Sequence, residues 1–362
     1  MNVRYVRWII LGMILACSLI LNYLHITAGS VFPSVHAICP LGGLENLQVW
    51  LSGHGNLQKL FSGTMTLFFF SVGFTFIFGR ALCGNICPFG ALMEFIGKIT
   101  PHQYSPPASI DTPLRYLKVG ILVIVTGMAW ITTSIWISPY DPYVAYAHIW
   151  SGAELFTENG VGLYILILVL IAALVINRFF CRYLCPAGGL FALISRVSPT
   201  RIRHTGCIEC GKCARSCPMG INPGRTGWIN RTECIGCTTC VEVCPSTTPV
   251  LALTMAGKKI RPLLFVIGTV CVFFGALALF STLGLLQVTI PPLESVQQGG
   301  TSLNPIDLRG SMTIEEGAAY SGMNLTEFYS RMEIPASVPA NTNLKAVQDA
   351  VPGYDFHAMK AK

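Results

Sequence analysis

Hydrophobic residues gather along this chain in five stretches separated by polar segments. Each stretch reaches, or nearly reaches, the length of about 20 residues that a helix needs to cross a bilayer. The fourth is the shortest, but it carries no charge from Val161 to Ile176. The pattern therefore predicts a mainly α-helical membrane protein with about five transmembrane helices, at residues 8–28, 61–79, 117–137, 161–180 and 262–286.

A polar tail follows the fifth stretch, and its pattern predicts short helices rather than another span. Capping boxes begin helices, and this spacing occurs at Thr313-x-x-Glu316 and Asn324-x-x-Glu327. Gly322 is expected to end the first of these helices, Pro335 to end the second, and a third short helix is expected after Asn343. The tail is thus predicted to form a small helical module.

Composition agrees with a membrane protein. Of the 362 residues, 52% are hydrophobic and only 11% are charged, whereas a soluble domain carries about 25% charged residues. This excludes a disordered chain and an ordinary soluble enzyme. The chain also has 15 cysteines, and so many in a multi-span protein indicate metal or redox chemistry.

The distribution of charge predicts an orientation. Counting Lys118 at the start of the third stretch and Arg178 at the end of the fourth, 18 of the 24 Lys and Arg residues lie before the first stretch, between the second and third, or between the fourth and fifth. Basic residues favour the cytoplasmic side, so the N-terminus is expected in the cytoplasm. The tail, 287–362, has five basic and eight acidic residues and is expected outside. The apolar run continues past Cys17, which favours a retained first span over a cleaved signal peptide.

The strongest chemical signal is a pair of cysteine runs between the fourth and fifth stretches. Each run reads C-x2-C-x2-C-x3-C-P, the spacing of bacterial two-cluster ferredoxins. Three thiolates on a tight loop hold one cubane cluster, and the fourth cysteine reaches the other cluster. The runs predict two [4Fe–4S] clusters, the first on Cys207, Cys210, Cys213 and Cys244, and the second on Cys234, Cys237, Cys240 and Cys217.

Zinc ribbons and disulfides are the alternatives for these runs, but zinc usually takes two separated C-x2-C pairs rather than a triplet with a trailing Cys-Pro. Gly211 and Gly236 are expected to let the backbone approach sulfur closely. Residues 201–261 carry nine basic and three acidic residues. That excess would attract an acidic partner such as a soluble ferredoxin, or it reflects the positive-inside bias and contact with anionic lipid.

A second cysteine pattern repeats at an offset of 98 residues. Both copies read R-x-x-C-x-x-x-C-P-x-G, from Arg80 to Gly90 and from Arg178 to Gly188. Residues four apart on a helix share a face, so each copy is expected to present two sulfur atoms together. Four sulfurs from two pseudo-symmetric elements suit a third metal centre at the cytoplasmic membrane edge, on Cys83, Cys87, Cys181 and Cys185.

The alternative for these four cysteines is structural packing between spans, since disulfides are disfavoured on a reducing face. A fainter third copy begins at Cys39-Pro40 in the first outer loop and lacks the upstream cysteine. Cys39 could join a site but alone indicates a structural residue. Cys17 and Cys271 lie within spans, where a cysteine is most simply a small core residue.

Other polar residues give weaker signals. Four histidines could ligate haem or bind a quinone headgroup, and the alternative for each is an ordinary polar role. They are His25, His36, His54 and His148. Proton acceptance competes with solvated or capping roles at Glu94 and Glu154. No C-x-x-C-H occurs, which excludes covalent c-type haem, and no G-x-G-x-x-G follows a strand pattern, which excludes a nicotinamide domain.

With both cysteine patterns in view, residues 1–290 resemble the membrane polyferredoxins of anaerobic respiration. That family includes the periplasmic nitrate reductase subunit NapH and the C-terminal half of the nitrous oxide reduction protein NosR. The resemblance implies electron transfer between the quinone pool or a cytoplasmic donor and a partner reductase. Ser151-Gly152-Ala153-Glu154 lacks the threonine of a flavin-attachment motif, so covalent FMN is not expected. The outward tail is not a general NapH feature.

Together these observations predict an iron–sulfur electron-transfer subunit of the bacterial inner membrane. It would work with other redox subunits, with a soluble ferredoxin or quinone, and with an extracytoplasmic partner at the tail; no nucleic acid is expected. Two alternatives remain, a metal-reducing assembly factor for a respiratory metalloenzyme and a membrane anchor with structural clusters. A quinol dehydrogenase is a variant that needs a quinone pocket. The predicted domains are a four-span part (1–199), a two-cluster ferredoxin domain (200–256), a fifth helix (257–288) and the tail (289–362).

Overall fold

The computed structural model describes the helices, the strands and most of their connections. The described residues are 2–27, 39–51, 62–100, 103–132, 136–152, 154–204, 209–224, 232–245, 250–286, 312–344, 346–351, 353–354 and 359. Cys207, His36 and His54 lie outside them, as does the side chain of Glu154.

Three helices have the length and composition needed to cross a membrane: α1 (Val3–Thr27), α6 (Ala108–Thr132) and α14 (Pro262–Thr282). Two shorter apolar helices lie at the other two predicted spans, α3 (Ser62–Phe78) and α8 (Glu154–Val175). The prediction of a mainly helical membrane protein is confirmed. The backbone of α8 is not helical at Asn159, which leaves a shorter apolar helix at Asn159–Val175. This part of α8 and the 17-residue α3 fall below the about 20 residues of a full crossing.

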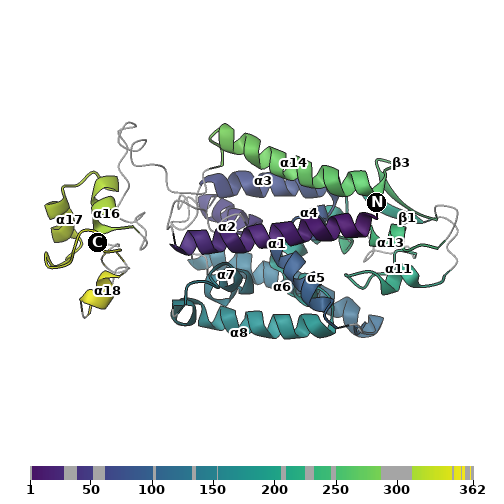
Figure 1. Ribbon diagram of the computed structural model, residues 1–362, viewed down its shortest axis with the longest axis horizontal. Helices are drawn as coiled ribbons and strands as arrows, with labels where there is room; N and C mark the ends of the chain where they lie inside the picture. The colour runs from purple at the N-terminus through teal and green to yellow at the C-terminus, as the bar shows by residue number, and fades with distance from the viewer. Residues whose placement is uncertain are drawn as a thin grey trace.

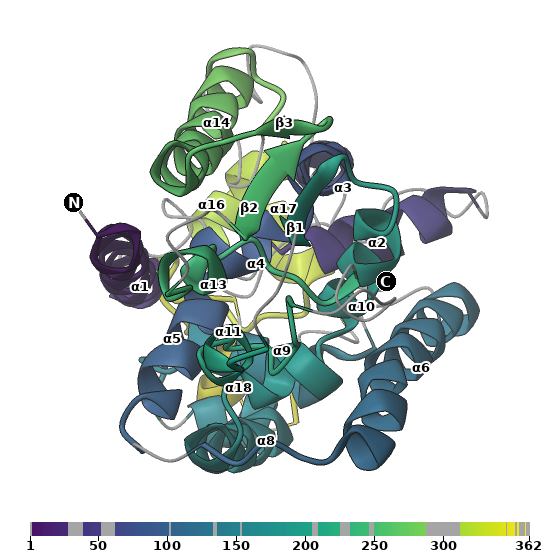
Figure 2. The ribbon, with the colours of Figure 1, turned by 90° about the vertical axis from the view of Figure 1, so that its right-hand side faces the viewer.

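The N-terminus lies at the same end of the molecule as residues 200–261, called the cluster segment below (Figure 1). This segment contains an antiparallel sheet of order β1-β2-β3, and Ile202 in β1 pairs with Leu253 in β2. In Figure 2, which views this end, the strands lie beside the start of α14. The elements are β1 (Thr200–His204), α11 (Lys212–Arg215), α13 (Thr239–Glu242), β2 (Leu251–Met255) and β3 (Lys258–Lys259).

Two connections return into the helix bundle instead of forming simple surface loops. α2 (Pro40–Leu51) packs so tightly on α3 that a Cβ atom on Gly43 would lie 2.4 Å from the carbonyl oxygen of Thr64. Between α6 and α8, η3 (Ser138–Tyr140) leads into α7 (Pro142–Ala147). The hydroxyl of Tyr146 in α7 lies 2.6 Å from that of Ser18 in α1, so this connection also reaches the bundle interior.

Each copy of the 98-residue repeat forms two short helices that meet at a Cys-Pro pair. Proline has no N–H and disfavours a helical residue before it. The helix therefore ends two residues before the second cysteine and begins again at the proline. The pairs are α4 (Ala81–Asn85) with α5 (Pro88–Gly97), and α9 (Phe179–Tyr183) with α10 (Pro186–Ser195).

The tail has a hydrophobic core of its own, which includes Phe328 and Leu344. Its capping box at Thr313 is confirmed, since the Thr313 N–H donates to Glu316 at 2.9 Å and the Glu316 N–H donates back at 3.1 Å. The second capping box is wrong, because Asn324 precedes a helix but makes no side-chain capping bond. The tail helices are α16 (Ile314–Tyr320), α17 (Leu325–Arg331) and α18 (Val347–Ala350).

Candidate metal centres

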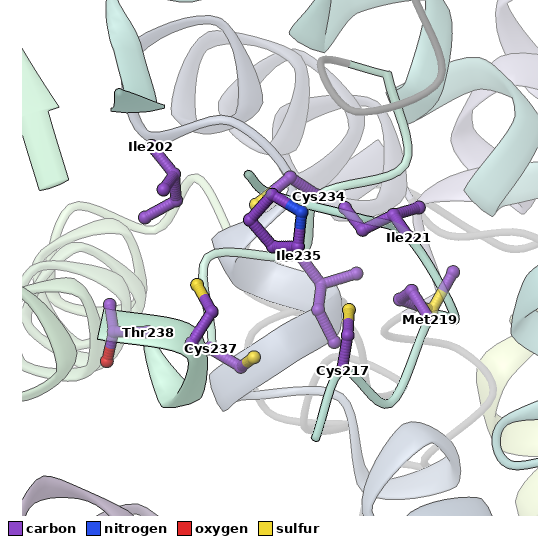
Figure 3. Close-up of a pocket in the computed structure, with 10 residues that line it drawn as sticks. Ile202, Cys217, Met219, Ile221, Cys234, Ile235, Cys237 and Thr238 are labelled. Carbon is purple, nitrogen blue, oxygen red and sulfur yellow. The ribbon is translucent and has the colours of Figure 1, made fainter. Parts of the chain in front are cut away.

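Four cysteines of the cluster segment surround one small cavity. Figure 3 shows Cys217, Cys234 and Cys237 around it, with Ile235 and Met219 nearby. The cavity has a volume of about 20 Å³, and its wall is otherwise mostly apolar. Its cysteines are the set that the sequence assigns to the second cluster, Cys217, Cys234, Cys237 and Cys240.

The backbone around the middle cysteine of both runs adopts the same unusual conformation. Gly236 and Thr238, on either side of Cys237, have φ values of +63° and +57°. Glu209 and Gly211, at the matching positions of the first run, have +53° and +70°. Left-handed residues next to right-handed ones turn successive N–H groups into one concavity that binds anions. A residue other than glycine adopts a positive φ only at a cost in conformational energy, and both Thr238 and Glu209 do so. This indicates a site built for a negatively charged group.

Backbone N–H groups also donate to sulfur in this segment. Cys217 accepts from Met219 and Ile221, and Cys234 accepts from Gly236. Burial nevertheless raises the pKa of Cys217 to about 12 and that of Cys234 to about 11. Such thiols stay protonated until a metal takes the place of the proton. Hydrogen bonds to cysteine sulfur are also one of the factors that set the potential of an iron–sulfur cluster, so this donor set fits such a cluster.

The first cluster set is only partly described, because Cys207 lies outside the described residues. Cys213 is buried and packs together with Cys244 against Leu251. The same apolar group includes Cys240 of the second set, so the two candidate centres are adjacent. Cys210 is exposed.

The four cysteines of the repeat line one large cavity. Its volume is about 460 Å³, and its walls include apolar side chains of α1 and α14. Cys17 and Cys39 line it as well, so the third Cys-Pro copy faces the same space as the other two. The sequence predicted that Cys83 and Cys87 share one helix face. This prediction is wrong, because the helix breaks between them. They are brought together with Cys181 and Cys185 by the pairing of the two broken helices.

The second cysteine of each copy is the N-cap of its helix. The Gly90 N–H donates to Cys87 Sγ at 3.4 Å, and the Gly188 N–H donates to Cys185 Sγ at 3.2 Å. Burial, together with the nearby Cys181 and Cys83, raises the pKa of Cys87 to about 12. Among the described His, Cys, Asp and Glu side chains, no three come together closely enough to hold a single metal ion.

Buried ion pairs join the repeat to its surroundings. Glu94 in α5 accepts from Arg7 at 2.6 Å and from Nε of Arg178 at 2.9 Å. Burial alone would raise the pKa of Glu94, but the guanidinium groups of Arg178 and Arg7 lower it to about 2. Glu94 is thus a buried ion-pair partner for two cations, a role different from the solvated, capping and proton-accepting roles that the sequence suggested.

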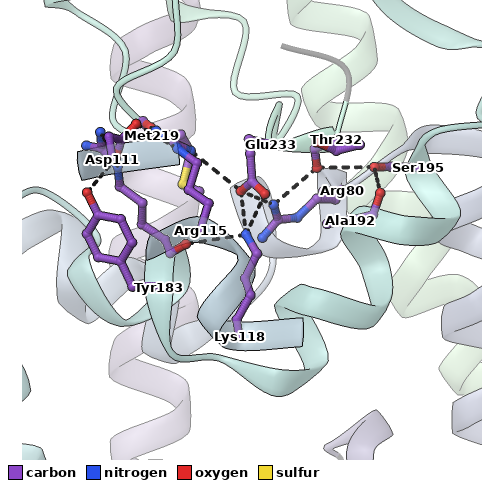
Figure 4. Close-up of polar contacts among 11 residues, drawn as sticks. Arg80, Asp111, Arg115, Lys118, Tyr183, Ala192, Ser195, Met219, Thr232 and Glu233 are labelled. Carbon is purple, nitrogen blue, oxygen red and sulfur yellow. Dashed lines mark hydrogen bonds and ion pairs between the residues drawn. The ribbon is translucent and has the colours of Figure 1, made fainter. Parts of the chain in front are cut away.

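A second carboxylate, Glu233, directly precedes Cys234 and fixes the cluster segment to the helix bundle. Lys118 donates to it at 2.6 Å and Arg80 at 2.8 Å (Figure 4). In the same network, Arg115 donates to the Met219 carbonyl at 2.7 Å. Cys83 also packs against Met219, Ile221, Ile235 and Cys237. It therefore belongs both to the large cavity and to the shell of the second cluster site.

The remaining candidates stand apart from these centres. The rings of His25 and His148 lie 6.4 Å apart. Cys271 is exposed on α14.

The roles of Arg80, Arg178 and Glu233 were not predicted from the sequence. The repeated arginine three residues before the first cysteine was the available signal for the first two.

The comparisons with known proteins agree with an iron–sulfur assignment. A family described as a 4Fe-4S binding domain matches residues 63–105 and 158–204, which hold the two repeat copies. A 4Fe-4S dicluster domain matches residues 199–245. The chain carries 4Fe-4S binding domains. No solved structure matches it.

Curated relatives point in the same direction. YccM of Escherichia coli, assigned by its name to electron transport, is 33% identical over 194 residues, which cover 50% of this chain and 53% of YccM. The methylamine utilization ferredoxin-type protein MauN of Methylobacillus flagellatus is 29% identical, over 45% of this chain and 59% of MauN. The regulatory protein NosR of Pseudomonas aeruginosa is 27% identical, over 43% of this chain and 23% of NosR. The chain thus spans about half the length of YccM and is a relative of ferredoxin-type electron-transport proteins.

Proposed function

We propose that this protein is a membrane-bound electron-transfer subunit that relays electrons between the quinone pool or a cytoplasmic donor and a partner oxidoreductase. The observation that carries the proposal is the position of Cys83, which lines the large cavity and also packs on the shell of the second cluster site. A redox carrier in that cavity would lie next to the cluster segment with no further domain between them.

The chain's residues would hold three iron–sulfur centres in this proposal, and the bound centres would supply one-electron transfer. Two are the centres of the cluster segment, with Cys207 as the remaining ligand of the first. The third is held by Cys83, Cys87, Cys181 and Cys185. Cys181 is buried and the other three are partly buried, and the N–H groups of Gly90 and Gly188 donate to Cys87 and Cys185. Both observations support cluster ligation over a packing role.

A lipid-soluble quinone is the proposed carrier from the membrane. The large cavity is lined by Met13 and Cys17 of α1 and by Phe274 and Leu277 of α14. Met13, Cys17 and Phe274 are exposed side chains of these apolar helices. Apolar walls with a few polar groups at one end are typical of cofactor sites, and here the thiols form such a group.

The proposed orientation places the N-terminus and the cluster segment in the bacterial cytoplasm and the tail outside. It rests on the distribution of basic residues. The cluster segment would then meet a soluble donor such as ferredoxin, and the tail would contact an extracytoplasmic redox partner. Other subunits of a membrane complex would carry out the chemistry on the final substrate.

Anaerobic purification with iron and sulfide counting and an EPR redox titration tests this proposal. The two clusters of the cysteine runs alone would give about eight irons per chain. A higher count that falls in both Cys83→Ala and Cys181→Ala supports the third centre, and Cys271→Ala is the matched control because it lies away from the cavity. A count that is the same in all three variants rejects the third centre. Bound copper in place of iron would favour the metal-reducing assembly factor instead.

Oxidation of a quinol by vesicles that contain the protein tests the carrier. Met13→Trp should fill part of the cavity and slow quinol oxidation while the iron count stays unchanged. Equal rates in the variant and the wild type would show that quinol does not use this cavity.

A further inference from the structure

The arginine of each repeat copy packs against the glycine of the other copy. A Cβ atom on Gly90 of the first copy would lie 3.1 Å from Nη1 of Arg178, which belongs to the second. A Cβ atom on Gly188 of the second copy would lie 3.1 Å from Nη2 of Arg80, which belongs to the first. Each glycine thus leaves room for the guanidinium of the other copy, beside the cysteine that caps its helix.

The two arginines differ in how their nitrogens are used. Arg178 donates two hydrogen bonds, from Nε to Glu94 at 2.9 Å and from Nη1 to the Cys83 carbonyl at 2.7 Å; its Nη2 makes no hydrogen bond among the described residues but lies 2.6 Å from the Glu94 carboxylate as an ion pair. Arg80 uses only Nη1, which contacts Glu233 at 2.8 Å and the Thr232 carbonyl at 3.2 Å. Its Nε and Nη2 have no partner among the described residues.

The free N–H groups of Arg80 belong to a side chain that is completely buried and that lines the large cavity. Buried donors without acceptors are costly and are rarely left so in native proteins. The thiols of Cys83 and Cys185 line the same cavity as Arg80, and after Glu233 they are the groups whose charge acts on it. The missing acceptor is therefore expected in the space that these cysteines line.

The position of a buried cation restricts the class of ligand. A cubane cluster on four thiolates carries net negative charge, and its sulfur atoms accept N–H hydrogen bonds. An anionic cluster held by these cysteines therefore matches the donors that Arg80 leaves without a partner.

We propose that Arg80 is a positioning and charge-compensating residue of the third centre, with Nε and Nη2 donating to an anionic, thiolate-held iron–sulfur cluster on Cys83, Cys87, Cys181 and Cys185. This inference rests on the proposed function of those four cysteines. A positive charge and donated hydrogen bonds stabilise the more negative, reduced state. Arg80 therefore raises the midpoint potential of this centre above the value that the cysteines alone would give.

The test is an EPR redox titration of the signal that disappears in Cys83→Ala. Arg80→Gln should shift its midpoint to a more negative potential, whereas Arg80→Lys, which keeps the charge, should shift it less. Arg196→Gln is the control, because it removes one charge from the exposed end of α10. Gly188→Ala is a second probe. Its methyl group would lie 3.1 Å from Nη2 of Arg80 and 3.5 Å from Sγ of Cys185; it leaves the charge unchanged and should shift the midpoint in the same direction.

The outcomes separate the inference from the function on which it rests. If Cys83→Ala and Cys181→Ala remove no iron and no signal, the third centre is rejected, and the role of Arg80 with it. If they remove the centre but Arg80→Gln and Gly188→Ala leave its midpoint unchanged, only the inference is overturned. Loss of the third centre in Arg80→Gln with retention in Arg80→Lys supports it. Loss of the centre in both Arg80 variants, with an unchanged midpoint in Gly188→Ala, overturns it.

Discussion

Gly84 approaches Ile235 so closely that a Cβ atom at position 84 would lie 2.0 Å from the Ile235 carbonyl oxygen. Gly84 follows Cys83 in the first repeat copy, and Ile235 follows Cys234 in the second cysteine run. The contact thus joins the large cavity to the cluster segment, backbone against backbone. Arg7 strengthens it by donating to the Gly84 carbonyl at 2.8 Å.

Gly84→Ala should displace the cluster segment from the helix bundle, because the new methyl group overlaps backbone atoms that cannot rotate away. Overpacking costs about 1–3 kcal/mol, and contact with a carbonyl belongs at the upper end. We expect a lower melting temperature and fewer irons per chain in detergent. Gly268→Ala in α14, where a Cβ atom would meet nothing, is the control. A Gly84→Ala protein with wild-type melting and iron would contradict this interpretation.

Cys217→Ala should remove the second cluster, although Cys217 belongs to the first cysteine run. It lines the cavity of Cys234, Cys237 and Cys240, so its loss should cost about four irons per chain and one EPR signal. The first cluster's signal should remain. Loss of the same signal in Cys234→Ala would support the shared site, whereas different signals lost in the two variants would refute it.

Glu94→Gln should be strongly destabilising. The carboxylate neutralises Arg7 and Arg178, which are both buried, and removing one side of a buried ion pair costs about 3–5 kcal/mol. The measurement is denaturant unfolding followed by tyrosine and tryptophan fluorescence. Glu315→Gln, an exposed carboxylate of the tail, should change stability by less than about 0.5 kcal/mol. Equal effects of the two substitutions would show that the buried pair contributes nothing particular.

Stability should fall in acid through the same carboxylate. The pKa of Glu94 lies at about 2, below its ordinary value of 4.5. The stabilisation is therefore complete above about pH 4.5 and is lost as the pH falls toward 2. The difference in unfolding free energy between the wild type and Glu94→Gln should shrink over this range. A difference that stays constant from pH 6 to pH 3 would place the effect elsewhere.

Six of the basic residues that indicate orientation in the sequence prove to be buried. Each of them donates to a carboxylate or a backbone carbonyl: Arg7, Arg80, Arg115, Lys118, Arg178 and Arg182. Counting charges cannot reveal such a role, since a basic residue at the end of a span has the same sequence signal whether it faces lipid headgroups or a buried carboxylate. Glu94 lies 84 residues from its partner Arg178 in the sequence, and Glu233 lies 153 residues from its partner Arg80.

The helical membrane class, the two cysteine runs and the repeat whose copies are offset by 98 residues can all be read from the sequence alone. These are local properties, set by runs of apolar side chains and by the fixed spacing of cysteines on a short loop. The tertiary structure was needed to show that Cys39 lines the same cavity as Cys83. It also shows that Arg80 packs against Gly188 of the second copy and Arg178 against Gly90 of the first. Such contacts depend on how separate helices pack, because close approach at Gly84, Gly90 and Gly188 is a property of paired surfaces that no single segment contains.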